Sequence, residues 1–393
     1  MPNAPTPETQ RELTTSEIVA LMDGHLRLGT NGVQAYLPSP MVQNHAAFLA
    51  FLPGGDLACA WFGGTMEGRG DISIWMARLA PGAHTWTAPQ RLTDAADRSE
   101  QNPVLFVAPD GVVWLFYTSQ PGGRQDECQI MARLSQDGGR RFGPARRIGE
   151  FTGIFVRQPV QITATGRWLL PGFHCIAPQG DRWTGGLDVA VALYSDNLGV
   201  SWAAEPVPDS LGAVHMNPVT ARNGIQPAFY RDRFSAHVQR SVSRDGGDTW
   251  GAPAPTNMPN NNSSLQAIRL ADGRIAMVLN PVNATMSDQR RASLYDEIES
   301  DAVAGTGGAI WGVPRAPMAL ALSSDDGASF RIAAVLEDGS GACLSNNSVA
   351  GVNKELSYPS ILQDPSGDLH IAYTYHRRAI KYLRLLLAEV GAV

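Results

Sequence analysis

Polar residues that can move protons or hold anions stand at the ends of short apolar runs in this chain. Histidine titrates near neutral pH and can accept or donate a proton. Tyrosine can serve as an acid or a nucleophile, and arginine can hold a carboxylate through two parallel hydrogen bonds. Brought together by the fold, such side chains would form a site for a negatively charged substrate. The residues concerned are His45, Asp71, Asn102, Arg157, His174, His215, Arg231, Arg233, Tyr358 and Arg377.

A repeated eight-residue phrase indicates the elements that position these residues. It reads Ser-x-Asp/Asn-x-Gly-x-x-Trp/Phe and occurs at residues 135–142, 195–202, 243–250 and 323–330. The Asp or Asn side chain can accept hydrogen bonds from backbone N–H groups in a turn, and glycine supplies a positive φ. The acidic residues of the phrase, Asp137, Asp245 and Asp325, are therefore expected to be structural. Recurrence of the phrase predicts a repeated supersecondary unit.

Six tight turns give a second periodic signal, at residues 53–56, 108–111, 164–167, 221–224, 271–274 and 365–368. Each lies between apolar runs, as in a β-hairpin. Most of these hairpins are followed by a third strand, and the repeated phrase leads into a fourth. Six four-stranded units predict an all-β fold, a six-bladed β-propeller in which residues 1–393 form one domain.

The last unit, residues 358–385, shows only three strands. The N-terminal segment, about residues 1–40, is expected to supply the missing outer strand through residues 24–37 and so close the ring. Two alternatives remain open. One has seven blades, with the N-terminal segment in a separate blade. The other is a solenoid, which would need shorter and more uniform units.

A propeller of this kind would bring the polar residues to one face. The tight hairpins all join first to second strands, so the starts of first strands and the ends of second strands meet around the axis on the opposite face. An insertion at about residues 282–315 is too long for a blade loop. We expect it to be an ordered lid beside the site, because it carries Arg291 and Trp311.

Composition limits the partners. The formal net charge of −6 and the pI near 5.8 argue against nucleic acid or an anionic membrane. No apolar run reaches transmembrane length, and the polar N-terminus carries no signal-peptide core. The latter points to the cytoplasm, or to secretion if the chain is a processed form. Cys59, Cys128, Cys175 and Cys343 lack metal-binding spacing and are expected to be free and buried. No cofactor or metal is expected, although a structural calcium between blades would leave no such pattern, and the oligomeric state is open.

The repeated phrases resemble the Asp-box (BNR) repeats of sialidases, which are six-bladed propellers, and the resemblance covers residues 40–390. Tyr358, in LSYPSIL, resembles the sialidase nucleophile, and Asp71 resembles the acid/base aspartate. Arg231 resembles the second arginine of the carboxylate-binding triad, and Arg290 or Arg291 resembles the third. The resemblance implies an exo-glycosidase that hydrolyses a terminal acidic sugar.

Two departures weigh against strict sialic acid hydrolysis. Sialidases carry Arg-Ile-Pro at the start of the first blade, where this chain has Gln43, Asn44 and His45. The glutamate that activates the nucleophilic tyrosine should fall near Met216 and Asn217, and none is present. A tyrosine without that base is a poor nucleophile, because its reference pKa is about 10.

The phrases AWFGGTMEGRGDISIW, PNNNSSLQ and ELSYPSI resemble a sialidase-like subgroup, some of whose members are similar to lyases that remove terminal L-rhamnose from glucuronate. Elimination beside a uronate needs a neutralised carboxylate, a base for the C5 proton and an acid for the leaving oxygen. Arg231, Arg233 and Arg291 would hold the carboxylate, while His45 and Tyr358 would act as base and acid. The remaining residues that would complete the ring are Arg157, His174 and His215.

We therefore predict an enzyme acting on an acidic oligosaccharide or polysaccharide, by elimination at a rhamnose–glucuronate linkage. The first alternative is sialidase-type hydrolysis, with Asp71 as the acid and Tyr358 as the nucleophile. The second alternative is a non-catalytic propeller that binds glycan.

Overall fold

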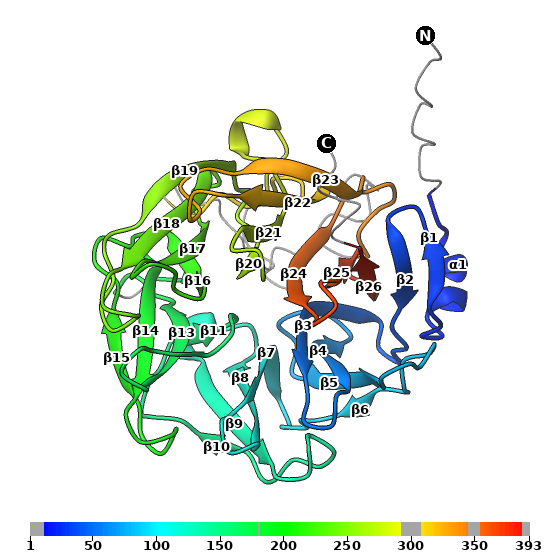
Figure 1. Ribbon diagram of the computed structural model, residues 1–393, viewed down its shortest axis with the longest axis horizontal. Helices are drawn as coiled ribbons and strands as arrows, with labels where there is room; N and C mark the ends of the chain where they lie inside the picture. Colours follow the sequence, from blue (N-terminus) through cyan, green and yellow to red (C-terminus); the bar gives the residue numbers. More distant parts are fainter. Residues whose placement is uncertain (1–11, 180, 292–307, 345–353, 387–393) are drawn as a thin grey trace.

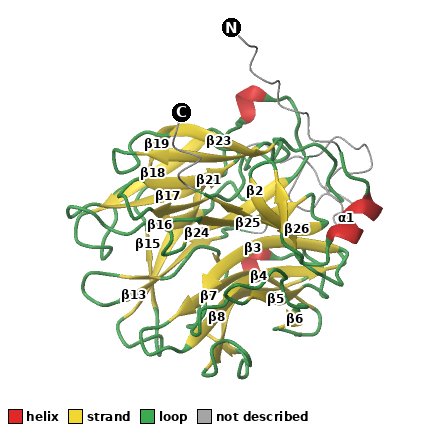
Figure 2. Cartoon of the chain, turned by 45° about the vertical axis from the view of Figure 1, so that its right-hand side comes forward, coloured by secondary structure: helices red, strands yellow, loops and turns green. Residues whose placement is uncertain are grey.

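The computed structural model describes residues 12–179, 181–291, 308–344 and 354–386. Its main sheets are six, each antiparallel, and they are arranged as blades around a central axis (Figure 1). The predicted six-bladed β-propeller is therefore confirmed, and the seven-bladed and solenoid alternatives are wrong. Figure 2 shows strands joined by loops, with the short helix α1 (Thr15–Leu21) at the edge of the fold.

Blades 1 to 3 follow one another along the chain. Blade 1 contains β3 (Gln43–Phe51), β4 (Leu57–Gly64), β5 (Ser73–Leu79) and β6 (Gln90–Arg91). Blade 2 contains β7 (Arg98–Val107), β8 (Val113–Pro121), β9 (Gln129–Ser135) and β10 (Arg146–Arg147), with the 3₁₀ turn η1 (Gln125–Glu127) between β8 and β9. Blade 3 contains β11 (Ile154–Val156), β12 (Gln161–Ile162), β13 (Trp168–His174), β14 (Val189–Ser195) and β15 (Ala203–Pro206).

Blades 4 and 5 repeat the pattern. Blade 4 contains β16 (Ala213–Pro218), β17 (Gln226–Asp232), β18 (His237–Ser243) and β19 (Ala254–Pro259). Blade 5 contains β20 (Gln266–Arg269), β21 (Ile275–Leu279), β22 (Met318–Ser323) and β23 (Arg331–Glu337). The insertion leaves blade 5 after β21 and begins with a second 3₁₀ turn, η2 (Ala284–Met286).

Blade 6 is built from both ends of the chain. It contains β24 (Leu356–Gln363), β25 (Leu369–Tyr375) and β26 (Ala379–Leu385), then β2 (Gly32–Tyr36) and β1 (Arg27–Gly29). Strand β2 pairs antiparallel with β26, with Val33 opposite Arg384 and Tyr36 opposite Lys381. It thus occupies the outer position that the sequence analysis assigned to residues 24–37, and it covers the edge that β26 would otherwise expose.

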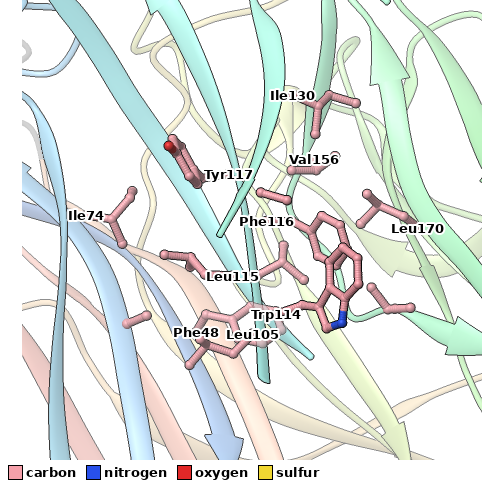
Figure 3. Close-up of a cluster of buried hydrophobic side chains, with 14 of the residues drawn as sticks. Phe48, Ile74, Leu105, Trp114, Leu115, Phe116, Tyr117, Ile130, Val156 and Leu170 are labelled. Carbon is pink, nitrogen blue, oxygen red and sulfur yellow. The ribbon is translucent and has the colours of Figure 1, made fainter. Parts of the chain in front are cut away.

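The core lies between neighbouring blades. Its largest apolar cluster joins blades 1, 2 and 3, and Figure 3 shows Phe48, Leu105 and Trp114 among its members. Trp114 meets Trp168 of the next blade edge to face, with ring centroids 5.4 Å apart. Such interlocked aromatic faces hold the blades in register. The four cysteines are free and buried, as expected.

The repeated phrases form the turns between third and fourth strands of blades 2 to 5. In the first of them, Oδ1 of Asp137 accepts a hydrogen bond from the backbone N–H of Arg141 at 2.8 Å. The Oγ of Ser135 accepts one from the N–H of Gly139 at 2.8 Å, where φ is +77°. The side chains therefore satisfy the turn's own backbone, and these acidic residues lie away from the axis.

A β-bulge near the start of the inner strand is repeated around the propeller. The antiparallel register shifts in β3, β7, β16 and β24, between the inner strand and its neighbour. Bulges re-aim side chains and are common beside active sites. The non-glycine residues with positive φ at these places, and just before β20, are Ala46, Asn102, His215, Asn262 and Tyr358.

None of the helices in the described ranges is long and apolar enough to cross a membrane.

Candidate functional site

A depression opens at the propeller axis on the face where the inner strands begin. We call it the axial depression. It encloses about 260 Å³ of empty space, counting the part open to solvent. Five predicted site residues line it: Asn102, His215, Arg231, Arg233 and Tyr358. The other lining residues are Glu67, Gln101, Gln125, Phe155 and Phe173.

Arg231 and Tyr358 form the centre of the axial depression. The Nη1 of Arg231 donates a hydrogen bond to the phenol oxygen of Tyr358 at 2.6 Å. Its Nε donates to Oδ1 of Asn262 at 2.7 Å, and its Nη2 has no hydrogen-bond partner among the described residues. Burial lowers the pKa of Arg231 to about 9, so the guanidinium is still a cation at neutral pH. A buried cation with a free N–H is suited to bind an anion.

Arg157 lies behind Tyr358 and supports the chain that carries it. Its Nη2 donates to the carbonyl oxygens of Ala47, Tyr358 and Pro359, at 2.8, 3.0 and 3.1 Å. These bonds tie the inner strands of blades 1 and 6 together. Arg157 is 1% exposed and is not among the lining residues, so it positions Tyr358 from behind.

Arg233 lines the axial depression, but a carboxylate of the protein already occupies its guanidinium. Its Nε and Nη2 donate to Oδ2 of Asp188 at 2.9 and 2.7 Å, and both side chains are buried. Burial raises the pKa of Asp188, and the Arg233 guanidinium opposes that rise. Because Asp188 neutralises it, Arg233 is a poor candidate for holding a substrate carboxylate.

Arg377 also forms ion pairs with carboxylates of the protein. Its Nε donates to Oε1 of Glu355 at 2.8 Å, and its Nη1 donates to Oε2 of Glu67. The same Oε1 of Glu355 accepts from Nη1 of Arg315 at 2.8 Å. Burial alone would raise the pKa of Glu355, but Arg377 and Arg315 together hold it well below its usual range. Arg377 thus links the buried Glu355 to Glu67 in the axial depression.

His45 lies beneath Tyr358, away from the depression. Its ring centroid is 4.2 Å from that of Tyr358, and its Nδ1 lies 2.8 Å from the Thr374 hydroxyl. The side chain is 1% exposed, and burial lowers its pKa well below the usual range. The neutral imidazole packs against the tyrosine ring at an interplanar angle of 50°, and it is not among the residues that line the axial depression.

Asp71 is exposed and bonded within its own loop. Its carboxylate accepts from the backbone N–H and the hydroxyl of Thr65, both at 2.9 Å. It is not among the lining residues, whereas Glu67 of the same loop is. The carboxyl group that faces the axis is therefore Glu67, since Arg377 draws it inward.

Two further predicted residues lie outside the lining. His174 ends β13, where it is half-buried opposite Ile154. Arg291 forms a β-bridge with Trp311, its N–H donating to the Trp311 carbonyl at 3.0 Å.

Residues 308–315, the described end of the insertion, pack against Arg231 in β17 and Arg233 just after it. The N–H of Ile310 donates to the carbonyl of Arg233 at 2.8 Å, and the Asn262 amide donates to the Ile310 carbonyl at 2.8 Å. The Trp311 ring centroid lies 5.8 Å from the Arg231 guanidinium carbon and 5.1 Å from that of Arg233. Residues 292–307 of the predicted lid lie outside the described residues.

His215 stands beside Tyr358 on the wall of the axial depression. The two rings meet edge to face with centroids 5.5 Å apart, and Nδ1 of His215 lies 2.9 Å from the Ser264 hydroxyl. Burial lowers the pKa of His215 well below its usual range, and the nearby Arg231 and Arg233 lower it further. Within the described ranges, no group of three or more His, Cys, Asp or Glu residues could hold a metal ion.

Residues 55–371 match the family of BNR repeat-like domains. The chain belongs to this family. A comparison with curated protein sequences gave no match.

Solved structures share the fold of this BNR repeat-like chain at low sequence identity. A Hadza microbial sialidase has a TM-score of 0.66 at 14% identity, over 89% of this chain and 66% of its own. The NanB sialidase of Streptococcus pneumoniae has a TM-score of 0.64 at 11% identity, over 94% and 71%. A Dyadobacter fermentans protein of unknown function has a TM-score of 0.65 at 15% identity, over 92% and 98%. At these identities the likeness establishes the sialidase-like propeller fold alone.

Sequence reasoning missed two buried groups that organise the site of this BNR repeat-like propeller, Glu355 and Asp188. Glu355 begins the ELSYPSI phrase, and a carboxylate entering an apolar strand is a signal that it has a cationic partner. Asp188 precedes β14 in the same way. Asp188 pairs with Arg233, the other lining arginine. Arg231 therefore lines the depression without a carboxylate partner among the described residues.

Proposed function

We propose that the protein is an exo-acting glycoside hydrolase of sialidase type, which removes a terminal acidic sugar from a glycan. One observation carries the proposal. The phenol oxygen of Tyr358 stands at the axis in a hydrogen bond with Arg231, whose remaining N–H group has no partner among the described residues. Nucleophile and anion-binding group would thus lie side by side. The names of the Hadza and Streptococcus pneumoniae structures, both sialidases, support the same class.

Arg231 would hold the carboxylate of the sugar. Its Nη2 is buried and unpartnered, and anion binding would compensate a cation that the described residues leave without a carboxylate. Asn102 would bind a sugar hydroxyl, because this residue lines the depression and its buried Oδ1 has no described partner. Such neutral acceptors fix orientation, while the charge pair supplies most of the affinity.

Tyr358 would attack the anomeric carbon. Negative charge on the phenol oxygen is stabilised by the Arg231 hydrogen bond, and the guanidinium carbons of Arg157 and Arg315 lie 5.6 and 5.7 Å from the ring centroid. Cations fixed around a reacting oxygen stabilise the charge that develops there in the transition state. Loss of the family's first-blade arginine leaves these cations around the nucleophile intact.

Glu67 would protonate the leaving oxygen and then activate water in the second step. Glu67 is the carboxyl group among the residues that line the axial depression. Its Oε2 accepts a hydrogen bond from Nη1 of Arg377, which fixes the position of the carboxyl group there.

Elimination receives less support from this geometry. A lyase needs a base that reaches the C5 proton of the uronate. His45, the predicted base, has its ring centroid 4.2 Å from that of Tyr358 and does not line the axial depression. Hydrolysis needs no base in that position.

Product analysis in heavy-oxygen water tests the proposal. The enzyme is incubated with sialyl, glucuronyl and rhamnosyl-glucuronate oligosaccharides, and the products are analysed by mass spectrometry and ultraviolet absorbance. Hydrolysis predicts release of a terminal acidic sugar carrying one heavy oxygen. An unsaturated uronate without heavy oxygen would instead establish elimination, and no turnover of any acidic substrate would overturn the proposal.

A further inference from the structure

We propose that His215 accepts the phenol proton of Tyr358, and that a sugar carboxylate bound at Arg231 enables it to do so. The inference rests on the proposed function, because it concerns the same site. It adds a proton acceptor to that site, and it makes the negative charge of the substrate part of the chemistry.

The phenol of Tyr358 needs an acceptor for its own hydrogen. Its oxygen already receives a hydrogen bond from Arg231, which can only donate. In the described part of the chain, no carboxylate is hydrogen-bonded to this oxygen. His215 is the titratable side chain that meets the Tyr358 ring from the wall of the axial depression, with ring centroids 5.5 Å apart. Both residues stand at inner-strand bulges with positive φ, +55° and +51°.

Neighbouring side chains favour the tautomer of His215 that this role requires. The Ser264 hydroxyl lies 2.9 Å from Nδ1 of His215, is within reach of the Leu265 carbonyl at 3.5 Å and accepts from Gln158 at 3.4 Å. With the serine hydrogen directed at the carbonyl, Nδ1 carries the imidazole hydrogen. The second nitrogen, Nε2, then keeps a lone pair and can take a proton.

Met216 and Asn217, the next two residues along β16, are not among the residues that line the axial depression. Met216 is in the core, and Oδ1 of Asn217 accepts the backbone N–H of Ala267 at 2.5 Å. Of these three neighbours, His215 is the one whose side chain lines the axial depression.

The free enzyme holds His215 neutral. The charged and titratable groups around it are Arg231 and Arg233, from the end of blade 4's second strand, Arg157 of blade 3, and Arg315 and Tyr358 beside blade 6. Burial and these four arginines lower the pKa of His215. Protonating it would therefore add a fifth cation to the cluster.

Two of the four arginines are already neutralised, Arg233 by Asp188 and Arg315 by Glu355. Arg231 has no described carboxylate partner, so a bound carboxylate would remove positive potential there. That change raises the pKa of His215 towards its ordinary value. An acidic sugar would thus improve the base as it binds, and a neutral sugar would leave the base ineffective.

The proposed step balances. The proton of the Tyr358 hydroxyl moves to Nε2 of His215 as the phenol oxygen bonds to the anomeric carbon. The bond from that carbon to the leaving oxygen breaks, and the leaving oxygen takes a proton from Glu67. Water then cleaves the tyrosyl–sugar bond, giving a proton to Glu67, and His215 returns its proton to the phenol oxygen. The net change is one water consumed for one sugar released.

Proton uptake on ligand binding tests the inference without requiring turnover. Binding of N-acetylneuraminate, of D-glucuronate and of neutral D-glucose is measured by calorimetry at about pH 6, in two buffers of different ionisation enthalpy. We expect the wild type to take up a fraction of a proton with an acidic sugar. In H215Q the affinity should change less than about threefold and the uptake should vanish. R231M should lose about tenfold or more in affinity.

A second variant keeps the test decisive if H215Q does not fold. S264A removes the group bonded to Nδ1, so it should change the pH midpoint of uptake and leave the affinity within about threefold. If the wild type takes up no proton when an acidic sugar binds, the role of His215 is overturned. The same holds if proton uptake is unchanged in both H215Q and S264A. Neither result would overturn the proposed hydrolase function. Failure of every acidic sugar to bind would overturn the proposed function itself.

Discussion

Nη1 of Arg231 and the phenol oxygen of Tyr358 lie 2.6 Å apart, although 127 residues separate them in the chain. Arg231 is the last residue but one of the second strand of blade 4, and Tyr358 stands at the bulge of the first strand of blade 6. Closure of the ring brings them face to face across the axis. In the proposed function Tyr358 is the nucleophile and Arg231 is the anion-binding cation, whose Nη2 has no hydrogen-bond partner among the described residues.

Replacing Arg231 should mainly lower catalysis, whereas replacing Arg233 should mainly lower stability. R231M removes the proposed carboxylate partner and should lower kcat/KM by roughly 30- to 1000-fold, which corresponds to about 2–4 kcal/mol. R233M leaves the buried Asp188 without its cation and should lower the free energy of unfolding by about 3–5 kcal/mol. Steady-state kinetics and denaturant unfolding of both variants separate the two effects. Equal catalytic losses with unchanged stability would contradict the assignment.

Removing the hydroxyl of Tyr358 should abolish turnover without disturbing substrate binding. Y358F should lower kcat roughly a thousandfold or more, since residues that act as one nucleophilic unit each carry most of the rate. The matched control is Y373F, because the Tyr373 hydroxyl bonds the buried Glu337 and lies outside the axial depression. That variant should stay active and lose about 1 kcal/mol of stability. Turnover by Y358F at more than a tenth of the wild-type rate would exclude a tyrosine nucleophile.

Glu67 and Asp71 offer a direct comparison of two carboxylates in one loop. E67Q should lower kcat about 100-fold or more on a natural glycoside and much less on an aryl glycoside, whose leaving group needs no proton. D71N should stay within about threefold of wild type, because Asp71 is bonded to Thr65 and exposed. Kinetics on the two substrate types check both. The opposite ranking would restore Asp71 as the acid.

Glu355 should contribute to the pH dependence of stability. Arg377 and Arg315 hold its pKa below the value of about 4.3 that it has in the unfolded chain. Its stabilising contribution is therefore complete above about pH 4.3 and is lost as the pH falls towards the folded-state pKa. Urea unfolding across this range should show a shallower acid slope for E355Q, together with lower stability at neutral pH. Parallel slopes for the two proteins would argue against the assignment.

Much of the fold followed from repetition in the sequence. The six turns and four repeated phrases predicted six blades, and the repeated position of inner-strand starts predicted that Asn102, His215 and Tyr358 meet at one face. These elements could be predicted from local sequence, because the hydrogen bonds of each hairpin and each repeated phrase are made within the same short segment.

The sequence did not predict the partners that lie far apart in the chain. Arg233 was predicted to bind substrate, but Asp188, from the loop of another blade, already neutralises it. Glu67 faces the axis because Arg377, 310 residues away, draws it there. His45 lies just before the bulge of β3, and the fold brings its ring centroid to 4.2 Å from that of Tyr358, which is in blade 6. No local pattern encodes such pairings.

A trapped glycosyl-enzyme would show directly whether Tyr358 is the nucleophile. A fluorinated acidic sugar, whose fluorine beside the anomeric carbon slows the second step, is incubated with the enzyme, and the digested protein is analysed by mass spectrometry. We expect the peptide containing Tyr358 to gain the mass of one sugar, and Y358F to gain none. Product formation without any adduct, or an adduct on another residue, would contradict this expectation.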